Sequence, residues 1–544
     1  MKKTTLFIAL ALLVGARAFA QEWEHYFEYN TSDASRVSYD EAYELSDGRI
    51  MVASHFLFSN DCGLFRYSQP ALLALTAEGT ETGTEVYLKE GFQANPPYIL
   101  ENEAGEPYMM LAYNPDHDTC SANYFGNFNP TTDHSILGLY KLNDDLSIAE
   151  SHETEIPIDI YEGLEHNPIF FFNCGHIHLT TAFVDTEGYI VGAYIKTVSY
   201  NYSKPRGFDS TFFFRMDFDG NMLDCVGYSG RGYSGCVTST SEHATRHNLI
   251  EADSLYLFYG KYGYVTDEEN KNLIYLDHDF NIVRTRRYIH KPQMYPSYYD
   301  WFDFLTVVRS PEGQSYVAST VREQYDNQCC CLYLSEDGID KPYNVVGFRC
   351  WLERKTSYVD RIAQYKSVDV SPDNTLYYGY ALKSSDMFDS WVVVERLGWE
   401  LDSISAVYVR PSDDSINSLA NSVTATADGG VIVTFTDRMM NMPKRSAWVA
   451  KYPADVFVGV EEAHANGLKV AIAYPNPGTS ELDIRTSLRD ARVEVYDAAG
   501  RLVHGQEITE EVTPIGTEAW PSGMYVWKVY KGNAEAETGK WVKE

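Results

Sequence analysis

The chain has 544 residues, which is too long for one ordinary hydrophobic core, so at least two domains are expected. It carries 77 acidic and 44 basic residues. A surface this acidic repels phosphate backbones and anionic lipids. Length and charge therefore argue against a single small domain and against nucleic acid as a partner.

The first twenty residues have the features of a secretory signal peptide. Met-Lys-Lys-Thr-Thr precedes an apolar run from Leu6 to Val14, and Ala18 and Ala20 stand at the small-residue positions before a cut after Ala20. This run is too short to span a hydrocarbon core of ~30 Å, and no later run reaches about 18 apolar residues. We therefore predict a signal peptide at 1–20, export through the inner membrane, and a mature chain without a transmembrane segment.

Residues 21–458 repeat a short pattern seven times. In each unit a tight-turn signal precedes a run of β-branched and aromatic residues, as in Ser46-Asp47-Gly48 before RIMVAS. Asp-Gly and related pairs supply the positive φ that a hairpin turn needs, and the residues after them favour strands. The seven turns lie at 46–48, 104–106, 186–188, 252–254, 311–313, 372–374 and 427–429.

A second apolar strand follows each of these runs and usually ends in another Asp/Gly turn, as FFFRMDFDG does at Gly220. Units of roughly 55–80 residues with several short strands each are typical of β-propeller blades. A string of β-sandwich domains is the alternative, but it needs ~90–100 residues a unit. We predict an all-β fold with seven blades, with six or eight as open alternatives, and no long amphipathic helix.

Nine cysteines lie in the exported part of the chain, where disulfides can form. Because the number is odd, at least one is free or pairs between chains. Cys62 and Cys120 lie in equivalent insertions of neighbouring repeats and are the favoured pair. Cys225 with Cys236 is the second candidate pair. No C-x-x-C spacing supports a zinc site.

Two groups of residues in the repeats are candidates for ligand binding. His176 and His178 are two apart on an expected strand, so both imidazoles share one face and are a candidate metal pair. The alternative is a pair of ordinary strand histidines. Tyr298, Tyr299 and Trp301 belong to an aromatic-rich segment that, if exposed, can stack on sugar rings or a partner protein.

No cofactor and no complete catalytic motif is identified in the repeats. Nothing in the sequence ties a third ligand, such as His166, His243 or His247, to the histidine pair. Acidic loops can hold Ca²⁺, but no D-x-[DN]-x-[DN]-G loop supports such a site. We therefore predict no catalytic residue, and we regard Ca²⁺ binding as unsupported.

The composition changes near residue 459, and four short motifs follow the change in order. Residues 459–469 carry no repeat signature and are predicted to be a linker. Alternating strands and turns in 470–544 predict a small β-sandwich. The motif residues are Tyr474, Pro475, Asn476 and Pro477, then Asp497, Gly500 and Arg501, then Gly523 and Tyr525, and finally Lys540 in the terminal strand.

By these motifs, residues 470–544 resemble the C-terminal sorting domain of the type IX secretion system. The resemblance implies interaction with the type IX secretion machinery and export across the outer membrane of a Gram-negative cell. It further implies cleavage in the linker, around 461–467, after which the cargo is attached to lipopolysaccharide or released. It says nothing about what the cargo does.

The sequence thus predicts a cell-surface or secreted protein with a propeller that binds a glycan or a surface protein. Two alternatives remain open. One is a secreted hydrolase whose carboxylates converge on the propeller mouth, and the other is a structural component of the surface layer. Fold alone does not decide among them, because propellers host many functions.

Overall fold

The computed structural model describes residues 23–28, 34–59, 66–87, 93–94, 96–114, 134–157, 171–172, 176–197, 200–201, 210–229, 246–252, 254–259, 273–286, 302–310, 315–322, 328–335, 345–350, 357–362, 366–384, 390–399, 401, 403–409, 417–438, 445–457 and 469–544. Apart from a short 3-10 helix, η1 (Ala454–Phe457), the regular structure in these ranges is β-strand. The prediction of an all-β chain is confirmed.

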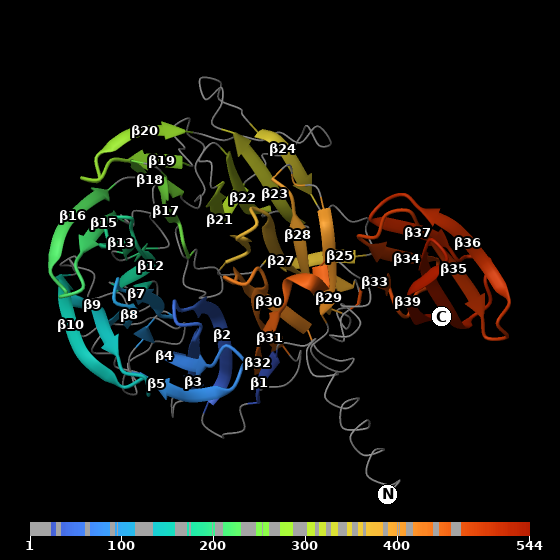
Figure 1. Ribbon diagram of the computed structural model, residues 1–544, viewed down its shortest axis with the longest axis horizontal. Coiled ribbons are helices and arrows are strands. Elements are labelled where there is room, and N and C mark those ends of the chain that lie inside the picture. The colour runs from blue at the N-terminus through green and yellow to red at the C-terminus, as the bar shows by residue number, and fades with distance from the viewer. Residues whose placement is uncertain are drawn as a thin grey trace, which may run out of the picture.

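Seven antiparallel sheets within these ranges stand around a common centre, each with its first strand innermost (Figure 1). This arrangement is a seven-bladed β-propeller, as predicted. We number the blades in chain order from the first complete sheet.

The first three blades use strands from the N-terminal half of the chain. Blade 1 consists of β2 (Ala34–Glu44), β3 (Ile50–Ser59), β4 (Arg66–Leu75) and β5 (Glu81–Val86). Blade 2 consists of β6 (Gln93–Ala94), β7 (Tyr98–Glu101), β8 (Pro107–Asn114), β9 (His134–Leu142) and β10 (Ile148–Pro157). Blade 3 consists of β12 (His176–Val184), β13 (Ile190–Thr197), β15 (Ser210–Met216) and β16 (Met222–Ser229). A separate small sheet pairs β11 (Phe171–Phe172) with β14 (Tyr200–Asn201).

The remaining blades follow the same plan. Blade 4 consists of β17 (Leu249–Ala252), β18 (Leu255–Tyr259), β19 (Leu273–Leu276) and β20 (Ile282–Arg286). Blade 5 consists of β21 (Phe302–Arg309), β22 (Ser315–Arg322), β23 (Gln328–Ser335) and β24 (Val345–Cys350). Blade 6 consists of β25 (Ser357–Ile362), β26 (Val368–Val370), β27 (Leu376–Ser384), β28 (Ser390–Leu397) and β29 (Ser403–Val409). Blade 7 consists of β30 (Asn417–Ala425), β31 (Val431–Arg438), β32 (Arg445–Tyr452) and β1 (Trp23–Glu28).

The turns predicted from sequence join the first strand of a blade to its second. Gly48 and Gly429 lie in two of them, and their φ angles are 86° and 85°. Only glycine adopts this region without strain from a Cβ atom, which explains the Asp-Gly signal.

The ring of blades is closed by the N-terminal strand. β1 pairs antiparallel with β32, with Trp23 opposite Lys451 and Glu28 opposite Ser446. Blade 7 therefore takes three strands from the end of the propeller and its outermost strand from the start of the chain. This pairing joins the two ends of the propeller and protects the edge of β32.

The core of the propeller lies between neighbouring blades. Ile432 and Val449 of blade 7 pack against Ile50 and Val52 of blade 1 in one buried cluster. Similar clusters lie between blades 1 and 2, 2 and 3, 3 and 4, and 6 and 7. In these pairs the blades bury apolar side chains by stacking on their neighbours, which is the physical reason for the repetition.

Residues from 469 onward form a separate β-sandwich beside blade 6 (Figure 1). Its first sheet, which we call the inner sheet, consists of β33 (Ala471–Tyr474), β34 (Glu481–Thr486) and β37 (Val512–Gly516). Its second sheet consists of β35 (Ala491–Asp497), β36 (Leu502–Ile508), β38 (Gly523–Lys531) and β39 (Ala534–Lys543). Trp527 and Trp541 are buried in the core between the two sheets.

No helix within the described ranges has the length and apolar character that crossing a membrane requires.

Candidate functional site

In every blade one position recurs near the centre of the propeller, on the innermost strand or just before it. In blade 1 it is Asp40, which lies eight residues before Gly48 at the end of the predicted turn. Counting back eight residues from Gly105, the middle residue of the predicted turn in blade 2, and from the last turn residue in the other blades defines a set that we call the inner ring: Asp40, Pro97, Thr180, Arg246, Leu305, Lys366 and Asn421.

The inner strands are irregular at this position. Asp40 and Thr180 are extra residues in the pairing of β2 with β3 and of β12 with β13. Leu305 and Asn421 interrupt the pairing of blades 5 and 7 in the same way. Such bulges bend a strand and leave backbone groups for partners outside the ladder.

Groups at and next to these positions tie neighbouring blades together. Asn421 donates through Nδ2 to the carbonyl of Tyr39 at 2.6 Å, which links blade 7 to blade 1. The amide of Lys366 donates to the carbonyl of Asn421 at 3.3 Å, which links blade 6 to blade 7. The hydroxyl of Tyr98 donates to the carbonyl of Thr180 at 2.6 Å, which links blade 2 to blade 3. The inner ring therefore satisfies backbone groups that burial would otherwise leave unpaired.

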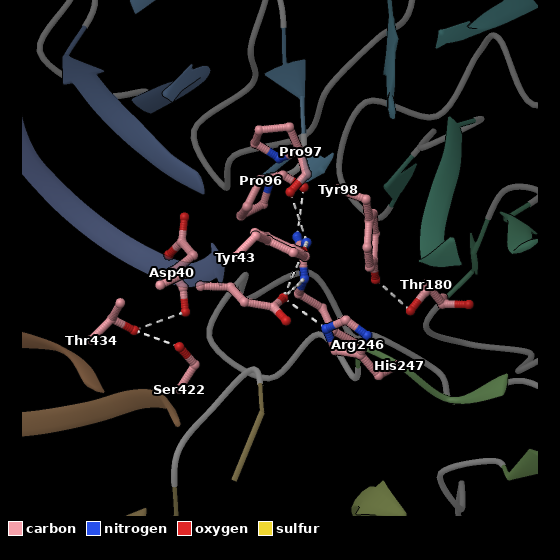
Figure 2. Close-up of polar contacts among 12 residues, drawn as sticks. Asp40, Tyr43, Pro96, Pro97, Tyr98, Thr180, Arg246, His247, Ser422 and Thr434 are labelled. Carbon is pink, nitrogen blue, oxygen red and sulfur yellow. Dashed lines mark hydrogen bonds and ion pairs between the residues drawn. The ribbon is translucent and has the colours of Figure 1, made fainter. Parts of the chain in front are cut away.

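Side chains from three blades meet inside this ring (Figure 2). Blade 1 supplies Glu41 and Tyr43, blade 2 supplies Tyr98, and the segment leading into blade 4 supplies Arg246 and His247. We call these five residues the central cluster. It joins blades that are not neighbours in the ring.

Arg246 is the hub of the central cluster. Its side chain is only 2% exposed, and its Nη1 and Nη2 donate to the carbonyls of Pro96 and Pro97 at 2.6 and 2.8 Å. Its guanidinium carbon lies 3.8 Å from the ring centroid of Tyr98, within cation–π distance. Carbonyl and aromatic partners of this kind suit arginine, whose flat cation presents several donors in a fixed geometry.

Glu41 is the counter-charge, and its side chain is 1% exposed. Its Oε2 lies 2.7 Å from Nε2 of His247 and 3.5 Å from Nε of Arg246, and it accepts from the Tyr43 hydroxyl at 2.9 Å. Burial alone raises the pKa of Glu41, but His247 and Arg246 outweigh it and lower that pKa to about 2. The carboxylate is therefore ionised at any physiological pH.

The lowered pKa of Glu41 makes it unsuited to acid–base catalysis at the centre of the propeller. A general acid needs a carboxyl pKa raised toward the working pH, whereas that of Glu41 is lowered. A carboxylate with a pKa of about 2 is also a poor general base. His247 is 20% exposed, whereas Arg246 and Glu41 are 2% and 1% exposed.

Two further carboxylates near the centre also have basic partners. Asp40 Oδ2 lies 2.6 Å from Nδ1 of His55, and Asp369 Oδ2 accepts from Nζ of Lys366 at 2.8 Å. Within the described residues, no group of three or more His, Cys, Asp or Glu side chains is arranged to hold a metal ion.

The turn motif of the C-terminal sandwich has a clear structural role. Asp497 Oδ1 accepts from the amides of Ala499 and Arg501 at 2.9 and 3.0 Å, and Asp497 Oδ2 accepts from Nε of Arg501 at 2.7 Å. Gly500 has a φ of 77°. Asp, Gly and Arg at this spacing thus fix the tight turn between β35 and β36.

The other motifs hold the terminal strand in place. Asn476 accepts from the amide of Val542 at 2.9 Å and donates to the carbonyl of Lys540 at 3.0 Å. The indole of Trp541 donates to the carbonyl of Pro475 at 2.6 Å. The proline-rich segment, which ends at Pro477, thus binds β39 through side chains from both segments.

Gly523 and Tyr525 lie at the start of β38, the neighbour of β39. Gly523 pairs with Lys543 in the ladder between these strands. The Tyr525 ring packs beside Trp520 and Trp541 at 4.9 and 5.9 Å between centroids. The proline-rich segment, the start of β38 and the terminal strand itself therefore meet around β39.

The candidate residues of the propeller are only partly described. His178 lies on β12 and is 9% exposed, whereas the side chain of His176 is outside the described set. The segments that contain Tyr298, Tyr299 and Trp301, and those with Cys62, Cys120 and Cys236, also lie outside the described residues. These assignments stay predictions.

Cys225 is the one candidate disulfide residue whose side chain is described. It lies on β16, is exposed, and has its sulfur 3.7 Å from the hydroxyl of Tyr194. Although the residue is exposed, partial burial of its sulfur raises the pKa of the Cys225 thiol. Its predicted partner, Cys236, is outside the described residues, so this pairing also stays a prediction.

Sequence reasoning missed the central cluster. The sequence offers His247 only as a third metal ligand without a link to the histidine pair, but its ring pairs with Glu41 while its amide donates to the carbonyl of Thr180 at 2.9 Å. The signal that could have found Arg246 is its spacing, because it lies eight residues before the end of the predicted turn, as Asp40 does.

Comparison with known proteins identifies the C-terminal sandwich. Residues 472–544 match the family described as the secretion system C-terminal sorting domain. The resemblance inferred from the four motifs is therefore confirmed, and we call residues 469–544 the sorting domain. No curated protein matches the chain.

Solved structures share weak similarity with most of the chain. A protein of unknown function from Dyadobacter fermentans is 10% identical, with a TM-score of 0.38, covering 80% of this chain and 98% of that one. PorZ, a surface component of the type IX secretion system of Porphyromonas gingivalis, is 8% identical, with a TM-score of 0.24 and coverages of 95% and 82%. A Synechocystis apocarotenoid oxygenase is 8% identical, with a TM-score of 0.36 and coverages of 70% and 72%. At these TM-scores the similarities carry no argument about function.

Proposed function

We propose that this chain is a surface protein of a Gram-negative bacterium whose propeller binds a glycan or a protein ligand without catalysing a reaction. The family match at 472–544, within the sorting domain, indicates delivery by type IX secretion to the cell surface or the medium. The signal peptide at 1–20 would supply the first step of that route, through the inner membrane.

The observation that carries the non-catalytic assignment is the pairing of buried Glu41 with Arg246 and His247 in the central cluster. Propellers gather functional groups at the centre of the ring, and here the centre is occupied by a carboxylate and a guanidinium that neutralise each other. Glycosidases need a carboxylic acid of raised pKa beside a second carboxylate. Glu41, with a pKa of about 2, does not meet that requirement.

The proposed ligand contacts are Tyr298, Tyr299 and Trp301. Aromatic side chains supply large contact areas for sugar rings and protein surfaces. A strongly acidic chain favours neutral or basic ligands over anionic ones, because it repels the latter. A neutral glycan or a basic protein surface is therefore the expected ligand class.

Glycan and surface-protein arrays probed with the mature chain, residues 21–544, test this function. We expect a ligand whose binding weakens when Tyr298, Tyr299 and Trp301 are replaced together by alanine. Leu223→Ala, which removes an exposed apolar side chain of blade 3, is the control. Absence of any ligand at high micromolar concentration would refute binding and leave a structural role in the surface layer.

A secreted hydrolase is the second candidate, and one contact favours it. The pair formed by Glu41 and His247 resembles the carboxylate–imidazole unit that orients a histidine base, and His247 is partly exposed. If the propeller is a hydrolase, a library of glycans and peptides will contain a substrate whose turnover His247→Gln abolishes. No turnover by the wild-type chain would exclude this candidate for the library tested.

A further inference from the structure

The inner sheet of the sorting domain is buried on both of its faces. One face packs on the second sheet of the sorting domain, as in any sandwich. The other face packs on blade 6 of the propeller. A three-stranded sheet covered on both sides is a contact between two folded bodies rather than an exposed surface.

Strand β33 divides its side chains between the two bodies. Ala471 belongs to the core of the sorting domain, whereas Ile472 and Tyr474 belong to a buried cluster with Tyr380 and Tyr408 of blade 6. This alternation follows from the period of two in a strand. Ile472 is 2% exposed and Tyr474 is 6% exposed, so separating the bodies would expose both.

Strand β34 shows the same division. Leu482 and Ile484 point into the sorting domain, but Arg485, only 1% exposed, donates through Nη2 to the hydroxyl of Tyr380 in blade 6 at 2.9 Å. The same nitrogen lies 2.5 Å from Oε1 of Glu511. A buried arginine with one partner in each body makes the contact specific as well as apolar.

Backbone groups complete the contact. Lys469 and Tyr408 exchange two amide–carbonyl bonds of 3.1 and 3.3 Å, and the amide of Ala406 donates to Oγ of Ser487 at 2.9 Å. These bonds join the outer strand of blade 6, β29, to the beginning of the sorting domain. They pair some of the backbone amide and carbonyl groups that β29, an edge strand, presents at the rim of the propeller.

All these contacts use residues up to 409 on one side and from 469 on the other, so none requires an intact linker. We propose that blade 6 is a docking surface for the chain's own sorting domain and that the domain stays bound there, non-covalently, after the linker is cut. Cutting removes the high effective concentration of a tethered partner but leaves the buried surface unchanged. The secretion machinery must then displace blade 6 to reach Ile472, Tyr474 and Arg485.

The test uses the mature chain with a specific protease site inserted between residues 459 and 468. After complete cutting at about 1 μM, we expect the two pieces to elute together and to give a 1:1 mass in native mass spectrometry. Pieces that separate, while each keeps the circular dichroism of a folded β protein, would overturn the proposal.

Variants on both sides of the contact sharpen the test. Arg485→Met removes the buried cation, and we expect dissociation of the cut pieces to be about tenfold faster. Tyr380→Phe removes only the accepting hydroxyl on the propeller side, and we expect a smaller acceleration even if Arg485→Met fails to fold. Arg492→Met is the matched control, because Arg492 donates to the carbonyl of Gly532 within the sorting domain. Unchanged dissociation in both test variants would overturn the assigned contact.

Discussion

Two buried arginines mark the two contacts that organise this molecule. Arg246 sits in the central cluster of the propeller, and Arg485 sits between blade 6 and the sorting domain. Each faces one glutamate and one tyrosine ring, Glu41 and Tyr98 for the first and Glu511 and Tyr380 for the second. The two sites therefore use the same side-chain chemistry.

The two sites differ in whether their contacts can break without unfolding. Arg246 joins blades 1, 2 and 4 of one closed ring, so its contacts break only when the propeller unfolds. Arg485 joins two bodies, each with its own apolar core, so its contacts can break while both stay folded. Similar interactions thus stabilise a fold in one place and a reversible contact in the other.

The largest expected effect is at the propeller centre. Arg246→Met leaves Glu41 as a buried, partly uncompensated charge, and we expect the propeller to lose about 4 kcal/mol of stability. A urea titration followed by circular dichroism measures this loss. Arg492→Met should stay within about 0.5 kcal/mol of wild type. A shift of that small size for Arg246→Met would mean that the central cluster does not hold the ring together.

The next largest effect is expected at low pH, where protonation of Glu41 should remove its contribution to the stability of the propeller. The folded-state pKa of Glu41, about 2, lies below its ordinary value of 4.5, so its stabilisation is complete above pH 4.5 and is lost as the pH falls through 2. The difference corresponds to about 3 kcal/mol. In urea titrations at pH 2–7, Glu41→Gln should lack this part of the acid-induced loss. If stability falls equally with pH in the wild type and in Glu41→Gln, ionised Glu41 does not stabilise the propeller.

A smaller and more local effect is expected at the domain contact. Arg485→Met should weaken docking by about 1.4 kcal/mol, which corresponds to the tenfold change expected for the cut pieces, because Glu511 is partly exposed and can regain water. Hydrogen exchange of the intact chain should speed up in β33 and in β29 but not in blades 1 to 4. Equal acceleration throughout the propeller would show that the two bodies unfold together.

The smallest effect is expected at a turn far from both arginines. Asp497→Ala removes the acceptor for the amides of Ala499 and Arg501, which should exchange faster with solvent. Docking on blade 6 should not change, because this turn lies between β35 and β36 of the other sheet. Weakened docking in this variant would mean that the two sheets of the sorting domain are strongly coupled.

The blades could be predicted from the sequence because their turns and strands are specified by residues that are neighbours in the chain. A turn such as Ser46-Asp47-Gly48 and the strand after it are specified by neighbouring residues, through positive φ and β propensity. The sorting motifs were readable for the same reason, since Asp497 and Arg501 bond within one turn. The central cluster was not, because Glu41 and Arg246 are 205 positions apart and meet only when the ring closes.

The sequence by itself determined the all-β repeat and the sorting domain and favoured seven blades over six or eight, because each depends on short segments with their own turn and strand preferences. Only the tertiary structure decided that β1 closes blade 7, that Glu41 meets Arg246, and that Arg485 meets Tyr380. These contacts join residues far apart in the chain, and no local preference specifies them. They depend on how burial brings whole blades and domains together.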